Sequence, residues 1–204
     1  PLSPPGTGGY STTNTIILGE MLEKLTGGPV EEVVTDVAAS LGMADTALQA
    51  TDQSAMPAPA SHGYVETLGA QAMPPGVAIP VGTDVTDWTP SWGQAGGGMY
   101  STIADLGTWA ASGLGTSLLP ADLAAKRLSF HDLSAEKISY GLGLEDYGKG
   151  WIGHSGQLIG WEAITLTNPE TGAAFVAMVN ETGSLVAAKA VAAQIWPELA
   201  SLLR

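Results

Sequence analysis

Residues 150–180 read GWIGHSGQLIGWEAITLTNPETGAAFVAMVN, and this stretch decides the fold class. It contains short apolar or alternating runs at 150–156, 160–167 and 173–180, separated by glycines and by the sequence Asn-Pro-Glu-Thr-Gly. Apolar or alternating runs of this length that are bounded by turn formers are typical of β-strands. A similar run at 140–147 precedes them. Together the four runs predict an antiparallel meander.

Helices are predicted on both sides of this meander. Apolar residues recur at helical spacing over 13–25, and a second helix, opening on a proline, is expected over 29–42. Thr102 and Asp105 form a capping box that starts a further helix. A broad apolar face over 184–203 predicts a last helix.

The order of these elements predicts an α+β fold, in which helices cover an antiparallel sheet. Residues 1–139 are expected to form a helical and loop-rich part, because 44–98 carry six prolines and little periodicity. Residues 140–204 carry the strands and the last helix. Since 204 residues is about the length of one domain, we expect both parts to form one composite domain.

The charge of the chain excludes two classes of partner. Lys and Arg number 7 against 20 Asp and Glu, a net charge of −13. No Lys or Arg lies between Lys24 and Lys126. An acidic surface repels phosphate backbones and anionic lipid headgroups, so we expect neither nucleic acid nor a membrane surface as a partner.

Metal and cofactor sites are not expected either. The chain has no cysteine, and its three histidines, His62, His131 and His154, belong to no motif with metal-ligand spacing. No apolar run approaches the ~18 residues that predict a membrane span.

Two short motifs contain a serine that could be a nucleophile. Gly153-His154-Ser155-Gly156-Gln157 approaches the G-x-S-x-G elbow of α/β-hydrolases, but that elbow needs a strand-to-helix turn, and a strand is predicted after it. Residues 134–137 spell S-x-x-K, in which a lysine could activate the serine from one helical turn away. They stand just before a predicted strand, so a surface turn is the favoured interpretation. Residues 143–149 are interpreted as a hairpin turn.

Seven segments, in this order, resemble the penicillin-recognising serine hydrolases, in particular the group of class C β-lactamases, D-alanyl-D-alanine carboxypeptidases and related esterases. They are PPGTGGYSTTN (4–14), ILGEMLEKLTG (17–27), LGMADT (41–46), GGGMYSTIADL (96–106), YGLGL (140–144), GHSGQLIGW (153–161) and VN (179–180). The resemblance implies a serine β-lactamase/DD-peptidase-like fold, incomplete at its N-terminus.

The resemblance also implies the site residues. Tyr10 matches the family's catalytic tyrosine, and His154-Ser155-Gly156 matches its H-x-G triplet. A phenol near a cation can take the serine proton and return it to the leaving group. The implied roles are catalysis for Tyr10 and His154, and substrate binding for Thr12, Ser155, Gly156 and Gln157, with the Gln157 N–H in an oxyanion hole. Thr12 stands where the family has Asn, which leaves substrate preference open.

The family's nucleophile lies upstream of the tyrosine loop, and this chain begins at Pro1. We therefore expect the C-terminal part of a serine hydrolase that acts on a D-Ala-D-Ala peptide, a β-lactam or an ester through an acyl-serine, with the nucleophile outside the chain. Two alternatives stay open, a non-catalytic binding domain of the same fold and an α/β-hydrolase using Ser155. The resemblance implies that a missing N-terminal segment, or a second copy in a homodimer, pairs with the edge of strand 173–180. It also implies export to the periplasm, cell envelope or medium.

Overall fold

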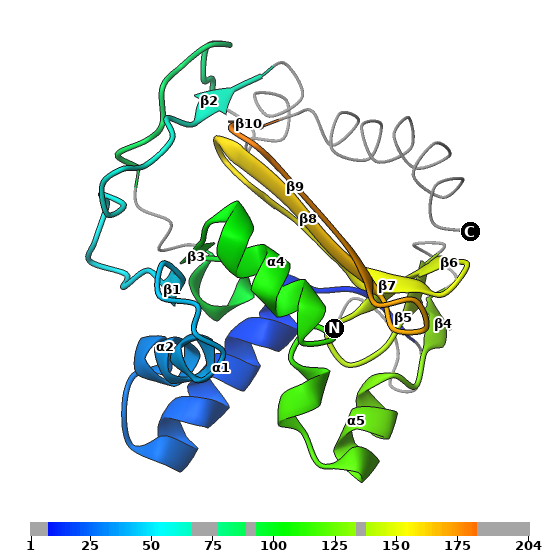
Figure 1. Ribbon diagram of the computed structural model, residues 1–204. Helices are drawn as coiled ribbons and strands as arrows, with labels where there is room; N and C mark the ends of the chain where they lie inside the picture. Colours follow the sequence, from blue (N-terminus) through cyan, green and yellow to red (C-terminus); the bar gives the residue numbers. More distant parts are fainter. Residues whose placement is uncertain (1–7, 67–76, 89–92, 134–137, 183–204) are drawn as a thin grey trace.

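The computed structural model describes residues 8–66, 77–88, 93–133 and 138–182 of the chain. Helices precede a long antiparallel sheet, as predicted, so the fold is α+β (Figure 1). The helices are α1 (Thr12–Thr26), α2 (Val30–Ser40), α4 (Ile103–Ala111) and α5 (Ala121–Arg127), with the 3₁₀ turns η1 (Gln94–Gly96) and η2 (Thr116–Leu118). The strands are β1 (Ala47–Leu48), β2 (Tyr64–Val65), β3 (Met99–Tyr100), β4 (His131–Leu133), β5 (Ile138–Tyr140), β6 (Glu145–Gly148), β7 (Trp151–Leu158), β8 (Trp161–Asn168), β9 (Ala173–Val179) and β10 (Glu181–Thr182).

One antiparallel sheet carries strands β4 to β9 in chain order. The meander predicted from residues 150–180 is confirmed as β7, β8 and β9. β8 is the most buried of the three because it lies between β7 and β9. The sheet also includes β4 and β5, so it begins before residue 140, where the strand-rich part was expected to start.

Two details of the predicted strands were wrong. Residues 140–147 form the end of β5 and most of β6, with a turn between them, rather than one strand. The hairpin turn expected over 143–149 is largely strand β6, and the chain turns into β7 at Lys149 and Gly150, which both have positive φ. A glycine-rich segment with two acidic residues looked like a turn, but pairing with β5 and β7 makes it a strand.

The first two helices match their predictions closely. α1 ends at Gly27, which has the left-handed φ of 76° that a helix C-cap favours. α2 begins directly after Pro29 and ends one residue before Leu41. The glycines and the proline between them explain why one helix stops and the next starts there.

Helix α4 shows only half of the predicted capping box. The Thr102 hydroxyl accepts a hydrogen bond from the Asp105 backbone N–H, as expected. The Asp105 carboxylate instead accepts hydrogen bonds from Asp45 N–H and the Thr46 hydroxyl, each at 2.8 Å. It therefore ties the segment after α2 to α4.

Apolar side chains pack on both faces of the sheet. α4 lies across β8 and β9 on one face (Figure 1). Ala110 and Leu114, from the end of α4 and the turn after it, pack with Leu144 and Ile152. A second cluster is centred on Trp151, Ile164 and Leu166, and a third, at the far end of the β7–β8 hairpin, on Val65, Ile79 and Val85.

Other predictions fall on different parts of the chain. The stretch 44–98 contains only short elements where it is described, as expected. The last helix, 184–203, and the S-x-x-K at 134–137 lie outside the described residues. In the parts that are described, no helix has the length and apolar character needed to cross a membrane.

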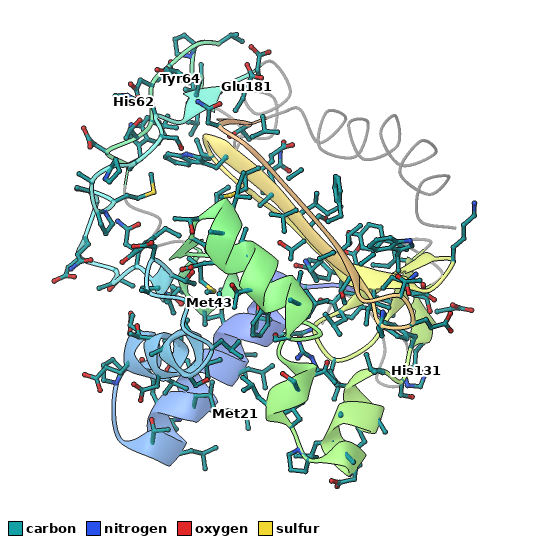
Figure 2. The ribbon with its side chains drawn as sticks, in the orientation of Figure 1. Met21, Met43, His62, Tyr64, His131 and Glu181 are labelled. Carbon is teal, nitrogen blue, oxygen red and sulfur yellow. The ribbon has the colours of Figure 1, made fainter. Side chains whose placement is uncertain are left out.

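Figure 2 shows His62, Tyr64 and Glu181 at the same end of the molecule, near β2 and β10, and His131 at the opposite end.

Candidate active site

Three rings from distant parts of the chain meet beside β7. The ring centroids of Tyr10 and Tyr140 are 5.7 Å apart, those of Tyr10 and His154 are 6.0 Å apart, and those of Tyr140 and His154 are 5.6 Å apart. Tyr10 precedes the N-cap of α1, Tyr140 ends β5, and His154 lies within β7. The structure therefore brings together both predicted catalytic residues, Tyr10 and His154, and adds Tyr140.

Local packing places each of these rings. Gly8 lies directly against the side chain of Leu133 in β4, so the chain approaches α1 along this end of the sheet. Tyr140 pairs with Glu145 across β5 and β6, and Glu145 pairs with Gly153 across β6 and β7. Because His154 follows Gly153 directly, the three strands deliver Tyr140, Glu145 and His154 to one place.

Both nitrogens of the His154 ring have close partners. The Tyr140 hydroxyl lies 2.8 Å from Nε2, and the backbone oxygen of Ser155 lies 2.5 Å from Nδ1. The Glu145 carboxylate is further away, with Oε1 3.9 Å from Nε2. The His154 side chain keeps 31% of its surface exposed, whereas Glu145 keeps only 13%. The ring is thus fixed in orientation while one side of it remains open.

The surroundings hold the Tyr140 phenol in its protonated form. Burial raises the pKa of Tyr140 to about 12, and the charges of Tyr10 and Glu145 act in the same direction. Burial likewise raises the pKa of Tyr147, on β6, with a further contribution from Glu145. The negative charge of Glu145 and the burial of both phenols make the surroundings of Tyr140 and Tyr147 unfavourable for a further anion.

The rest of the predicted triplet lies on a strand with an open side. β6 pairs with β7 only as far as Gly153, and β8 covers the other side of β7 along its length. Among the described residues, no strand pairs with the first side of β7 from His154 onward. Ser155, Gly156 and Gln157 follow on this strand, and a Cβ at Gly156 would meet nothing within 4 Å. An extended substrate backbone would find room and unpaired strand edge here.

Thr12 packs against the turn η1. It is the first residue of α1, and its methyl group lies against Gly96 of η1. Its backbone oxygen accepts a hydrogen bond from the Thr15 hydroxyl within the helix. The described contacts of Thr12 thus belong to the packing of α1 on η1.

Sequence reasoning missed Tyr140 and Glu145. Tyr140 stands in the YGLGL segment that carries part of the family resemblance, but nothing in a single sequence assigns it to the His154 ring. Glu145 was not predicted as a site residue because the segment 143–149 was interpreted as a turn. The alternation of β6, in which Glu145 and Tyr147 are half-buried and Asp146 and Gly148 are exposed, is the signal that could have found it.

The geometry also bears on Ser155 as a nucleophile. Ser155 lies in the middle of β7, paired with Ile164 of β8. A nucleophile elbow requires a sharp turn from a strand into a helix. The strand predicted after this serine is confirmed as β8, so Ser155 lacks the setting of an α/β-hydrolase nucleophile.

Comparisons with known proteins agree with this fold. The family model described as Beta-lactamase matches residues 1–199. The structure is similar to a D-stereospecific amidohydrolase from Streptomyces sp., with a TM-score of 0.74 and 28% identity, covering 88% of this chain and 52% of that one. It is also similar to a D-amino acid amidase from Ochrobactrum anthropi SV3, with a TM-score of 0.72 and 25% identity, covering 88% of this chain and 53% of that one.

A penicillin binding protein from Bacillus halodurans shares the fold at 22% identity and a TM-score of 0.70, covering 93% of this chain and 58% of that one. The chain thus spans little more than half the length of these relatives. Because the family model matches nearly all of the sequence and the same fold recurs in these solved structures, the chain belongs to the Beta-lactamase family.

Proposed function

We propose that this chain is the C-terminal part of a serine hydrolase that cleaves an amide or ester through an acyl-serine, with the nucleophile in a segment outside the 204 residues. The meeting of Tyr10, Tyr140 and His154 beside the unpaired side of β7 carries this proposal. Proton-transfer groups placed next to an open strand edge are what a hydrolase of extended substrates needs.

Each candidate residue has a role in the proposed reaction. Tyr10 accepts the proton of the attacking serine hydroxyl while the serine oxygen bonds to the substrate carbonyl carbon, and then gives that proton to the leaving group. His154 and Ser155 position the substrate, and the absence of a side chain at Gly156 leaves room for its backbone. The N–H of Gln157 stabilises the negative charge that develops on the carbonyl oxygen.

Amides of D-amino acids are the first substrate class to test. Two structural relatives are named as a D-amino acid amidase and a D-stereospecific amidohydrolase. D-Ala-D-Ala peptides, β-lactams and simple esters are the next classes to test, because the same acyl-serine chemistry cleaves all of them.

Kinetic assays on the 204-residue chain and on the longer gene product test this function. We expect the 204 residues to hydrolyse neither nitrocefin, nor a p-nitrophenyl ester, nor D-phenylalanine amide above background. Turnover that is abolished by Ser134→Ala would overturn the proposal and make the internal S-x-x-K the nucleophile.

A longer product that contains an upstream S-x-x-K should turn over at least one of these substrates and lose most of that activity with Tyr10→Phe. Tyr100→Phe, on β3, is the matched control and should keep the activity. A fluorophosphonate should label the upstream serine. Labelling of Ser155 instead would favour the α/β-hydrolase chemistry.

A non-catalytic binding domain is the second candidate, and Thr12 favours it. The residue stands where the family has Asn, and its methyl group contacts Gly96 of η1. Under this alternative, the longer gene product would bind D-amino-acid amides in a calorimeter without hydrolysing them.

We also propose that the outer side of β9 receives the missing N-terminal segment or a second copy of this chain. Among the described residues, β9 pairs only with β8, and an unpaired strand edge invites pairing. Light scattering should show a dimer or a complex with a fragment. A monodisperse monomer with rapid amide exchange along 173–180 would contradict this.

We also propose that the protein is exported from the cytoplasm, and cell fractionation tests this.

A further inference from the structure

The imidazole of His154 contacts a different kind of hydrogen-bonding group at each nitrogen. Nδ1 faces the backbone oxygen of Ser155 at 2.5 Å, and Nε2 faces the Tyr140 hydroxyl at 2.8 Å. A carbonyl oxygen only accepts hydrogen bonds, so Nδ1 must carry a hydrogen. A phenol both donates and accepts, so the state of Nε2 depends on which way the Tyr140 hydroxyl points.

We propose that Tyr140 is a positioning residue that donates its O–H to Nε2 and thereby holds His154 as the neutral, Nδ1-protonated tautomer. The inference rests on the proposed function, because it assigns a role within the same site. In this arrangement, hydrogen bonds run in one direction, from Tyr140 through the imidazole to the Ser155 carbonyl. The bond at the second nitrogen sets which tautomer a histidine adopts.

Among the described residues, three groups with titratable protons lie near the ring, and the geometry favours Tyr140 as the one that determines the state of Nε2. Glu145 would favour an imidazolium, but its oxygen is 3.9 Å from Nε2, beyond hydrogen-bond distance. Tyr10 contacts the ring as a tilted aromatic neighbour, with centroids 6.0 Å apart. Tyr140 meets the ring edge-on, with an interplanar angle of 89°, and is close enough to hydrogen-bond to Nε2.

This assignment changes what His154 contributes to the proposed reaction. A neutral ring whose Nε2 already accepts a hydrogen bond is neither a general base nor a cation that attracts a substrate carboxylate. Tyr10 then remains the proton-transfer group, and Tyr140 supports it through an edge-to-face contact with a centroid distance of 5.7 Å. The site would accept substrates that lack a carboxylate, such as amino-acid amides.

Nitrogen NMR of the intact chain tests the proposal without any need for activity. The chain has three histidines, so ¹⁵N-histidine labelling gives few signals, and His154→Gln identifies those of His154. At pH 7 we expect Nδ1 of His154 to have the shift of a protonated nitrogen and Nε2 that of an unprotonated one. A dominant Nε2–H tautomer, or protonation of both nitrogens, in the unmodified chain would overturn the proposal.

Tyr140→Phe removes only the proposed donor. We expect the ¹⁵N signal of His154 Nε2 to move toward the shift of an unprotonated nitrogen that accepts no hydrogen bond, while Tyr100→Phe leaves it unchanged. Nδ1 should stay protonated in both variants, because the Ser155 carbonyl still accepts its hydrogen bond. An unchanged Nε2 signal in folded Tyr140→Phe would refute the role of Tyr140, and the wild-type spectrum decides the tautomer even if this variant does not fold. If the longer gene product has no hydrolase activity, the proposed function fails, but the tautomer result still stands.

Discussion

Gly153 of β7 and Leu166 of β8 approach each other more closely than any side chain on Gly153 would allow. A Cβ on Gly153 would lie 2.6 Å from Cδ2 and 2.9 Å from Cα of Leu166, and it would overlap the backbone oxygen of Thr165. Backbone atoms in the middle of a sheet do not move aside easily. The close approach of these two strands sets the position of His154, the next residue.

We expect Gly153→Ala to destabilise the protein by roughly 1–3 kcal/mol, as overpacking of a core does. Gly156→Ala, three positions further on the same strand, is the matched control because a Cβ there meets nothing within 4 Å. Urea unfolding of both variants measures the difference. Equal unfolding midpoints for the two variants would show that β7 and β8 can separate at Gly153 without cost.

The sequence predicted the regular elements well because their signals are local. Helix α1 has apolar residues at helical spacing and a glycine stop, and strands β7 to β9 have alternating runs between turn formers. Strand β6 was predicted only in part, within the run 140–147 and against the turn expected over 143–149, because its pairing with β5 and β7 is what makes it a strand. Local composition at Glu145–Gly148 favours a turn, and tertiary contacts override it.

The candidate site was predicted in part for the same reason. Tyr10 and His154 are recognisable from motifs in the sequence around each of them. Their contact with Tyr140 depends on the order of strands β5, β6 and β7 and on the path of the chain past Leu133. Neither spacing nor composition carries that information. The predicted hydrogen bond from the Thr102 backbone N–H to the Asp105 side chain was wrong for the same reason. The Asp105 carboxylate instead accepts hydrogen bonds from residues sixty and fifty-nine positions away in the sequence.

Asp105 gives the next prediction. Its buried carboxylate accepts hydrogen bonds from Asp45 N–H and the Thr46 hydroxyl. In Asp105→Ala the Asp45 N–H loses its partner, and the Thr46 hydroxyl keeps only the Ser101 hydroxyl, 2.7 Å away. An unsatisfied buried group costs about 1–3 kcal/mol. We expect urea unfolding to show a loss of that size, and Asp122→Ala, an exposed first-turn residue of α5, to change stability far less. Similar losses for both variants would show that the carboxylate acts only through the dipole of its helix.

His62 and Asp84 form an exposed ion pair that should make stability depend on pH. His62 Nδ1 lies 2.7 Å from Asp84 Oδ2. The hydrogen bond to Asp84, followed by the charge of Asp84, raises the pKa of His62. Hydrogen bonds from Thr86, followed by the one from His62, lower the pKa of Asp84 to about 2.

The two shifts act in opposite pH directions. The stabilisation from His62 is complete below its ordinary pKa of ~6.5 and is lost as the pH rises through its raised value. The stabilisation from Asp84 is present above ~3.9 and is lost as the pH falls toward about 2. We expect the pair to stabilise the protein most between these limits.

Proton NMR titration of His62 in Asp84→Asn checks this. The pKa of His62 should fall toward its ordinary value, while Asp87→Asn, which removes a weaker contribution, should lower it less. A larger fall in Asp87→Asn than in Asp84→Asn would contradict the geometry of the pair.

Tyr140 should be one of the last tyrosines to ionise. Its pKa is raised to about 12, first by burial and then by the charges of Tyr10 and Glu145. The folded state therefore keeps the phenol proton after the unfolded chain has lost it at ~10, so this contribution to stability is lost as the pH rises from about 10 through 12. Glu145→Gln removes one of the smaller causes, so the pKa of Tyr140 should fall part of the way toward 10.

Titration of ¹³C-tyrosine signals, with Tyr140→Phe to identify the Tyr140 resonance, measures the shift. Asp146→Asn is the control, since it removes an exposed carboxylate from the next position on the same strand. If Asp146→Asn lowered the pKa of Tyr140 as much as Glu145→Gln does, the net charge of the sheet edge, and not Glu145 in particular, would be the cause of the raised pKa. A selective effect of Glu145→Gln would instead establish that this one half-buried carboxylate acts on the phenol that hydrogen-bonds to His154.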